Sequence, residues 1–140
     1  MSEQPRTFYF RKLVRDRTVP EYEKDPSVVG MSHTRLSGVL LTRELIAKIH
    51  EEADEIPVVD NPTDAERREI IAEIADLEDV VIALKAHYGI NDASTVDASA
   101  EKAAKRGKFE QGDYIESITV TPGSQWEQYC LADPGKYPLK

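Results

Sequence analysis

Five carboxylates stand at spacings that suit the binding of a metal ion. Glu51, Glu52 and Glu55 form an EExxE pattern, and Glu73 and Asp76 form an ExxD pattern further along the chain. In a helix, side chains three residues apart lie on one face, with their Cβ atoms about 5–6 Å apart. Each pattern can therefore present a pair of carboxylates to a neighbouring helix.

The position of these acids relative to the apolar residues indicates that they lie where two helices meet. On a helix of about 3.6 residues per turn, Glu52 falls at the edge of the apolar stripe and Glu55 flanks it, whereas Glu51 points away. Glu73 and Asp76 lie among the apolar positions of the second helix. We therefore expect four acids at one border of two packed helices.

Carboxylates crowded at a partly buried border repel one another, and at least one of them should be driven to protonate. These four acids have no obvious basic partner nearby in the sequence. A divalent cation removes the conflict, and ligation by carboxylate oxygens is typical of Mg²⁺, with Mn²⁺ as its substitute. The alternative is a solvated acidic face, as most charge runs on helices are.

Other motifs for metals and nucleotides are missing from the sequence. None of the three histidines has a glutamate three residues before it, as bundle di-iron sites require, and there is no HExxH zinc motif. There is also no phosphate-binding GxxxxGK[ST] loop and no GxGxxG. The carboxylate pattern therefore remains the main signal, and it favours a hard metal ion.

The first acids lie on a predicted helix over residues 42–56. Its apolar residues recur at helical spacing: Leu45, Ile46, Ile49, Ala53 and Ile56. Pro57 cannot donate a backbone hydrogen bond. If the helix ended there, Glu73 would lie about 10 Å past Glu55 at about 1.5 Å per residue. We therefore predict that Pro57 kinks this helix and that it continues through residues 58–59.

Two further helices follow. Thr63 and Glu66 form a capping-box pattern that should open a helix running to about residue 86, and Gly89 should follow its end. A third helix is predicted over residues 92–106. The regions outside the helices are predicted to be irregular, with short strands at residues 35–41 and 115–121 and a loop over 122–140. The expected fold is all-α, an antiparallel helical bundle in one domain over 1–140, with a core at 8–112 and a tail at 113–140.

Composition narrows the class of protein. The chain has 140 residues, a net charge of −8, 31% charged residues and one cysteine. The negative charge argues against a nucleic-acid partner, and no apolar run approaches the about 20 residues that span a membrane. The N-terminus lacks the apolar segment of a secretory signal. We expect a cytoplasmic protein.

The acids resemble those of a known family. EEADE followed by EIAD is similar to the MazG-like and phosphoribosyl-ATP pyrophosphohydrolase superfamily of all-α nucleotide pyrophosphohydrolases. The closer resemblance is to its house-cleaning branch, whose members have a KLVRD-like segment near the start and a KxxxRGxF-like segment at the end of the core. The chain has Lys12 to Asp16 and Lys102 to Phe109 at these places. The resemblance covers residues 8–112.

The resemblance implies Mg²⁺-dependent hydrolysis of a (deoxy)nucleoside triphosphate to the monophosphate and pyrophosphate. It implies four metal ligands: Glu52, Glu55, Glu73 and Asp76. Glu51 would be a further ligand or, like Glu52, the base that accepts a proton from water. The residues implied for the substrate phosphates are Lys102, Arg106, Lys12 and Arg15.

Two other functions fit the same residues. One is hydrolysis of phosphoribosyl-ATP, which needs the same metal site, and the other is a non-enzymatic helical module whose acids bind a basic partner. Whichever function is right, the second long helix carries apolar residues on nearly all of its faces. We therefore expect a homodimer or a homotetramer that buries apolar faces between subunits, and the resemblance implies the same.

Overall fold

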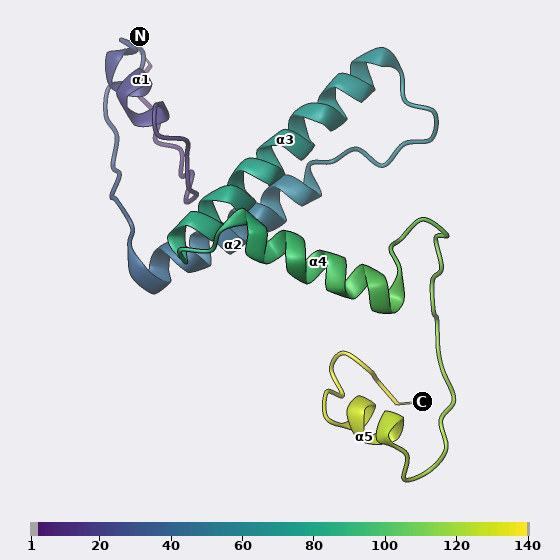
Figure 1. Ribbon diagram of the computed structural model, residues 1–140. Coiled ribbons are helices and arrows are strands. Elements are labelled where there is room, and N and C mark those ends of the chain that lie inside the picture. The colour runs from purple at the N-terminus through teal and green to yellow at the C-terminus, as the bar shows by residue number, and fades with distance from the viewer. Residues whose placement is uncertain (1–2, 140) are drawn as a thin grey trace. The chain divides into compact units, whose positions relative to one another are not determined.

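A computed structural model describes residues 3–139, which form five helices and no strand (Figure 1). The helices are α1 (Thr18–Lys24), α2 (Gly38–Asp54), α3 (Asp64–His87), α4 (Asp92–Arg106) and α5 (Gln125–Leu131). The all-α prediction is confirmed. None of the helices in the described residues is long and apolar enough to cross a membrane. The chain divides into two compact units, Met1–Ala98 and Ser99–Lys140, and the single domain stays a prediction.

Helix α2 begins at Gly38, four residues before the predicted start. The strand predicted at 35–41 is wrong, because residues 38–41 form the first turn of α2. Leu41 and Leu45 are four residues apart and share the face that turns inward, as a helix requires. The Thr42 hydroxyl lies 2.8 Å from His87 Nε2. This hydrogen bond joins the start of α2 to the end of α3.

Helix α2 ends at Asp54 with Glu55 as its C-cap, so the predicted kink at Pro57 is wrong. The proline lacks a backbone donor and disfavours helical geometry in the residue before it. Residues 55–63 carry the chain beyond the end of α2 before α3 runs back beside it (Figure 1). The first turns of α3 therefore extend past α2, and Glu73 returns to the level of Glu55.

The limits of α3 and α4 agree with the sequence, whereas α1 lies in a segment that was wrongly predicted to be irregular. Thr63 Oγ1 accepts a hydrogen bond from the Glu66 backbone at 3.2 Å, and Glu66 Oε1 accepts one from the Thr63 backbone at 3.1 Å. The capping box is therefore confirmed. Gly89 has a φ of 65°, in the left-handed region that favours glycine after a helix. The predicted bounds of α4 are confirmed without change.

The C-terminal unit differs from its prediction. Residues 115–121 are not a strand, because no described residue supplies a partner for a ladder. The predicted loop over 122–140 contains α5. Ser124 caps α5 by accepting a hydrogen bond from the Glu127 backbone at 3.2 Å. Serine followed three residues later by glutamate is the signal that could have revealed this helix.

The packing of α2 against α3 creates very little closed core. Leu45 is the one apolar side chain among the described residues that is classed as buried, at 7% exposed. Several apolar residues of the two helices remain open: Val39, Leu40, Ile46, Ile71, Ile74, Val81 and Ile82. The pair α2 and α3 therefore supplies the scaffold of the acidic residues, and the complete antiparallel bundle stays a prediction.

Candidate metal centre and adjoining pocket

Three carboxylates converge between α2 and α3. Glu52 lies in the last turn of α2, Glu55 caps that helix, and Glu73 lies in the middle of α3. One oxygen from each of the three lies within 4.8 Å of the others. The loop that returns α3 to this level brings them together. Oxygens at this separation can ligate one cation.

Two oxygens of this carboxylate cluster have no protein partner. Glu52 is only 6% exposed. Glu52 Oε2 and Glu73 Oε2 are buried and have no hydrogen bond to any described residue. A buried acceptor without a hydrogen-bond partner loses its hydration and forms no bond that replaces it. This free-energy cost is larger for a charged group. The orphaned oxygens and the all-carboxylate donor set both fit a hard divalent cation.

The acidity of Glu73 is strongly altered by its surroundings. Burial, followed by the neighbouring carboxylates of Glu55 and then Glu52, raises the pKa of Glu73 from 4.5 to about 7. This is the effect expected of crowded carboxylates, because each further negative charge disfavours ionisation. At neutral pH Glu73 is therefore about half protonated, and a bound cation would displace this proton.

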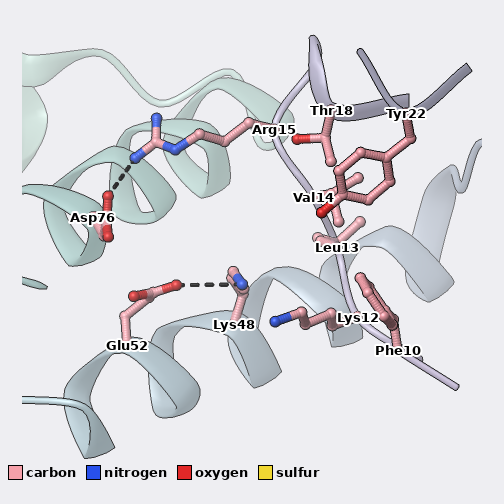
Figure 2. Close-up of a pocket in the computed structure, with 10 residues that line it drawn as sticks. All are labelled: Phe10, Lys12, Leu13, Val14, Arg15, Thr18, Tyr22, Lys48, Glu52 and Asp76. Atoms are coloured by element: carbon pink, nitrogen blue, oxygen red, sulfur yellow. Dashed lines mark hydrogen bonds and ion pairs between the residues drawn. The ribbon is translucent and has the colours of Figure 1, made fainter. Parts of the chain in front are cut away.

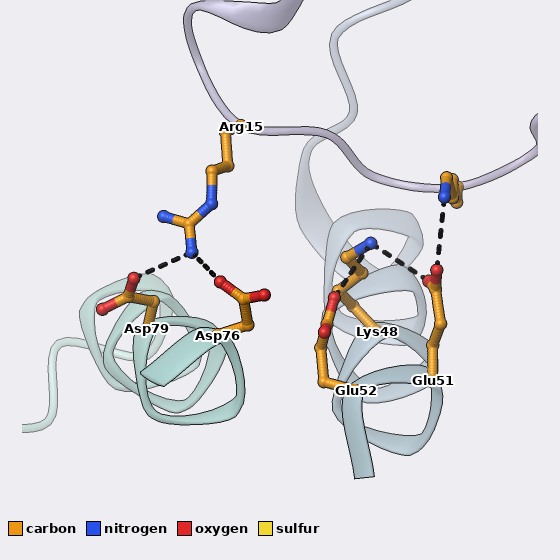
Figure 3. Close-up of polar contacts among 7 residues, drawn as sticks. Arg15, Lys48, Glu51, Glu52, Asp76 and Asp79 are labelled. Atoms are coloured by element: carbon orange, nitrogen blue, oxygen red, sulfur yellow. Dashed lines mark hydrogen bonds and ion pairs between the residues drawn. The ribbon is translucent and has the colours of Figure 1, made fainter. Parts of the chain in front are cut away.

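Asp76, the fourth ligand that the resemblance implies, faces an arginine instead. Arg15 Nη2 donates to Asp76 Oδ1 at 2.6 Å and to Asp79 Oδ2 at 2.9 Å (Figure 3). The hydrogen bonds that Arg15 donates to Asp79 and then to Asp76 raise the pKa of Arg15 above its ordinary value. The structure thus brings together three of the four implied ligands and pairs the fourth with Arg15.

Lys48 is a basic neighbour of the acids that the sequence analysis missed. Its Nζ lies 3.1 Å from Glu51 Oε2 and 3.2 Å from Glu52 Oε1 (Figure 3). The expectation that no sequence-local base pairs with the acids is therefore wrong for Glu52. The signal was the spacing, since Lys48 stands three and four residues before these acids, on the same helix face.

Glu51 lies between two lysines. In addition to Lys48, Lys12 Nζ lies 3.4 Å from Glu51 Oε1. Burial alone would raise the pKa of Glu51, but the hydrogen bonds and charges of Lys48 and then Lys12 outweigh it and lower the pKa. Burial likewise disfavours the charged form of Lys48, yet Glu51 and Glu52 raise its pKa. Glu51 is therefore an ionised carboxylate at neutral pH.

A pocket of about 220 Å³ adjoins the carboxylate cluster, and Glu52 belongs to both (Figure 2). Its walls come from the N-terminal segment and α1 on one side and from α2 and α3 on the other. The lining residues are Phe10, Lys12, Leu13, Val14, Arg15, Thr18, Tyr22, Lys48, Glu52 and Asp76. Lys12 and Arg15, both implied by the resemblance to approach the substrate, line this pocket.

The remaining residues implied for phosphate binding lie in the other unit. Lys102 and Arg106 are exposed on α4, within residues 99–140. Cations near the end of a helix are also favoured by the helix dipole. Their contact with phosphate stays a prediction.

Comparisons of the chain with models of protein families, with curated proteins and with solved structures found no match. The resemblance to the MazG-like superfamily therefore rests on the residues of this sequence. The carboxylate cluster and its pocket provide the structural basis for assigning a function.

Proposed function

We propose that this chain is a Mg²⁺-dependent pyrophosphohydrolase of the MazG-like type, which converts a (deoxy)nucleoside triphosphate to its monophosphate and pyrophosphate. One observation carries the proposal: the cluster of Glu52, Glu55 and Glu73 beside a pocket that contains cationic side chains. The cluster supplies ligands for a hard cation, and the pocket supplies positive charge for phosphate. Together they suit a metal-bound phosphoanhydride.

Three residues would hold the metal: Glu52, Glu55 and Glu73. When bound, Mg²⁺ would neutralise phosphate oxygens and lower the pKa of a water molecule. The protein would hold the phosphate chain with Lys12 and Arg15, which line the same pocket. A carboxylate would accept the proton of the attacking water, and Glu51 and Glu52 are our candidates. The two lysines that contact Glu51 make it a weak base but keep it ionised.

Asp76 would join the metal ligands only after Arg15 has released it. The guanidinium contacts Asp76 Oδ1, so it would compete with a metal ion for this carboxylate. A nucleotide that brings its own negative phosphates offers Arg15 another partner. We therefore propose that Arg15 moves from Asp76 to the phosphates when the metal–nucleotide complex binds.

A second copy of the chain would cover the apolar faces of α2 and α3. Ile71 and Ile82, both on α3, are 58% and 60% exposed. Apolar surface of this kind costs free energy in water at roughly 25 cal/mol per Å². We propose a homodimer or a homotetramer in which these faces are buried.

The direct test is a panel of ordinary, deoxy and modified nucleoside triphosphates incubated with Mg²⁺, together with phosphoribosyl-ATP. We expect pyrophosphate and a monophosphate as products, and no activity in EDTA. A Glu52→Gln variant purified in parallel controls for contaminating hydrolases. Release of orthophosphate and a diphosphate would contradict attack at the α-phosphorus.

The contact between Arg15 and the pair Asp76 and Asp79 also favours a second candidate. This acidic face accepts a guanidinium group in the structure, so it could accept one from a basic partner protein. That function requires no metal. A chain that neither hydrolyses any nucleotide of the panel nor gains thermal stability from Mg²⁺ would favour this candidate over the hydrolase.

A further inference from the structure

The pocket beside the carboxylate cluster has two chemically different ends (Figure 2). At one end, Lys48, Glu52 and Asp76 supply charges next to the cluster. At the other end the lining is mainly apolar and aromatic, with Phe10, Leu13, Val14 and Tyr22, and Lys12 Nζ lies 5.8 Å from the centroid of the Phe10 ring. The pocket therefore suits a ligand that carries most of its charge at one end and a flat apolar group at the other.

The aromatic end is formed by the N-terminal segment and α1. The rings of Phe10 and Tyr22 meet edge to face, with centroids 6.4 Å apart and an interplanar angle of 88°. They are 56% and 37% exposed, so parts of their surfaces remain open to a ligand. Thr18 stands one helical turn before Tyr22 and also lines the pocket. The two hydroxyls can each donate and accept a hydrogen bond.

We propose that this aromatic end binds the nucleobase of the substrate, with the phosphates directed toward Glu52 and Lys48. The inference rests on the proposed function, because it takes the ligand to be a metal-bound nucleotide. The opposite orientation would place the phosphates against the apolar side chains of Phe10 and Leu13 and away from the carboxylate cluster that would hold the metal, and this costs free energy. A flat base gains from contact with aromatic rings instead.

This orientation makes Phe10 and Tyr22 determinants of base binding. The ring surfaces contribute affinity for any base, because every base has a π face. The hydroxyls of Thr18 and Tyr22 would form hydrogen bonds with polar groups at the edge of the base and so distinguish one base from another. No sequence pattern singled out Phe10 or Tyr22, since the N-terminal segment, α2 and α3 that form the pocket are far apart in the chain.

The experiment compares two probes in the presence of Mg²⁺: a non-hydrolysable α,β-methylene nucleoside triphosphate and inorganic tripolyphosphate, each titrated by calorimetry. We expect Phe10→Leu and Tyr22→Ala each to lower the affinity for the nucleotide analogue about tenfold. The affinity for tripolyphosphate should stay unchanged. Tyr22→Phe should preserve affinity while altering the ranking of bases. Tyr9→Ala, which removes a neighbouring ring that does not line the pocket, is the matched control.

An equal loss of affinity for both probes in the Phe10→Leu variant would overturn the proposal, because it would mean that the ring only supports the pocket wall. Unchanged binding of the nucleotide analogue in both variants would overturn it as well. Circular dichroism of Tyr22→Ala reports whether α1 is retained, and Phe10→Leu decides the question if it is not. If analogues bind with the expected pattern but no triphosphate is hydrolysed, the base site stands and the hydrolase fails.

Discussion

Arg15 and Asp76 are 61 positions apart in the chain, yet Arg15 Nη2 lies 2.6 Å from Asp76 Oδ1. The pair joins the N-terminal segment to the middle of α3. It also occupies a carboxylate that the family resemblance assigns to the metal. The same contact can therefore restrain metal binding and hold the pocket wall in place.

Replacing Arg15 should separate these two effects. Arg15→Gln frees Asp76, so Mg²⁺ should bind a few-fold more tightly without nucleotide, since an exposed ion pair contributes about 0–1 kcal/mol. The kcat/KM for a nucleoside triphosphate should fall, because a phosphate contact is lost. Mg²⁺ titrations by calorimetry and initial rates check both, with Arg6→Gln as the control. Equal Mg²⁺ affinity in the variant and the parent would contradict competition for Asp76.

The pKa of Glu73 predicts how stability changes with pH. It is about 7 in the folded chain against 4.5 ordinarily, so the folded state holds this proton more strongly than the unfolded state. The resulting stabilisation is complete below about pH 4.5 and is lost as the pH rises through about 7. In EDTA, Tm should therefore fall over this interval more steeply for the parent than for Glu73→Gln.

With saturating Mg²⁺ the trend should reverse, because the metal binds the deprotonated carboxylate. The shift in Tm caused by Mg²⁺ should grow from pH 5 to pH 8. Identical pH profiles for the parent and Glu73→Gln, with and without Mg²⁺, would show that Glu73 is not part of a cation site.

Glu52→Gln should remove activity and leave the fold intact. Glu52 contributes a buried oxygen without a protein partner, and the neutral amide is a poor ligand for a hard cation. Turnover should fall at least about 100-fold, since replacing even a residue that hydrogen-bonds to a metal ligand lowers metal affinity or activity about 10- to 100-fold. Glu78→Gln, an exposed acid on α3 outside the carboxylate cluster, should retain full activity. Helicity by circular dichroism should be equal in all three proteins.

Lys48→Met should destabilise the metal-free chain. The lysine contacts both Glu51 and Glu52, and its loss leaves Glu52 with no positive neighbour at a buried position. We expect a loss of about 1 kcal/mol by urea unfolding in EDTA, and a smaller loss with Mg²⁺. In the double variant with Glu52→Gln the two effects should be less than additive. Additive effects would show that the pair does not interact, and Lys24→Met on α1 is the control.

A charge on the open face of α3 should prevent association. Ile82→Asp places a carboxylate on apolar surface that we propose lies between subunits, so light scattering should report a smaller particle than the parent. Ile115→Asp, at a still more exposed isoleucine outside α2 and α3, should leave the mass unchanged. A parent chain that is monomeric at micromolar concentration would refute the proposed oligomer directly.

Local signals predicted the three long helices α2, α3 and α4 but not the short helices α1 and α5. Thr63 and Glu66 are three residues apart, and their reciprocal hydrogen bonds involve only their own helix end. Gly89 and Gly107 end their helices with the left-handed backbone that glycine allows. The strand predicted at 115–121 failed because a strand requires a partner, and alternating apolar residues do not guarantee one.

The site depended on contacts that one segment cannot reveal. The acids were visible as EExxE and ExxD, but the approach of Glu55 to Glu73 follows from the path of residues 55–63 after α2 ends. The pairing of Arg15 with Asp76 depends on how the N-terminal segment folds across α3. Lys48 is different, because its spacing before Glu51 and Glu52 was readable and was overlooked.

The wall of the pocket formed by the N-terminal segment is tied to the helices by Lys12 and Arg15, through ion pairs that face the solvent. Dissolved salt weakens such pairs, since the screening distance shrinks from about 8 Å at 0.15 M to about 3 Å at 1 M. The apolar packing of α2 on α3 has no such sensitivity. The shape of the pocket should therefore depend on ionic strength. Concentrated salt should loosen the wall formed by the N-terminal segment, while α2 and α3 stay packed together.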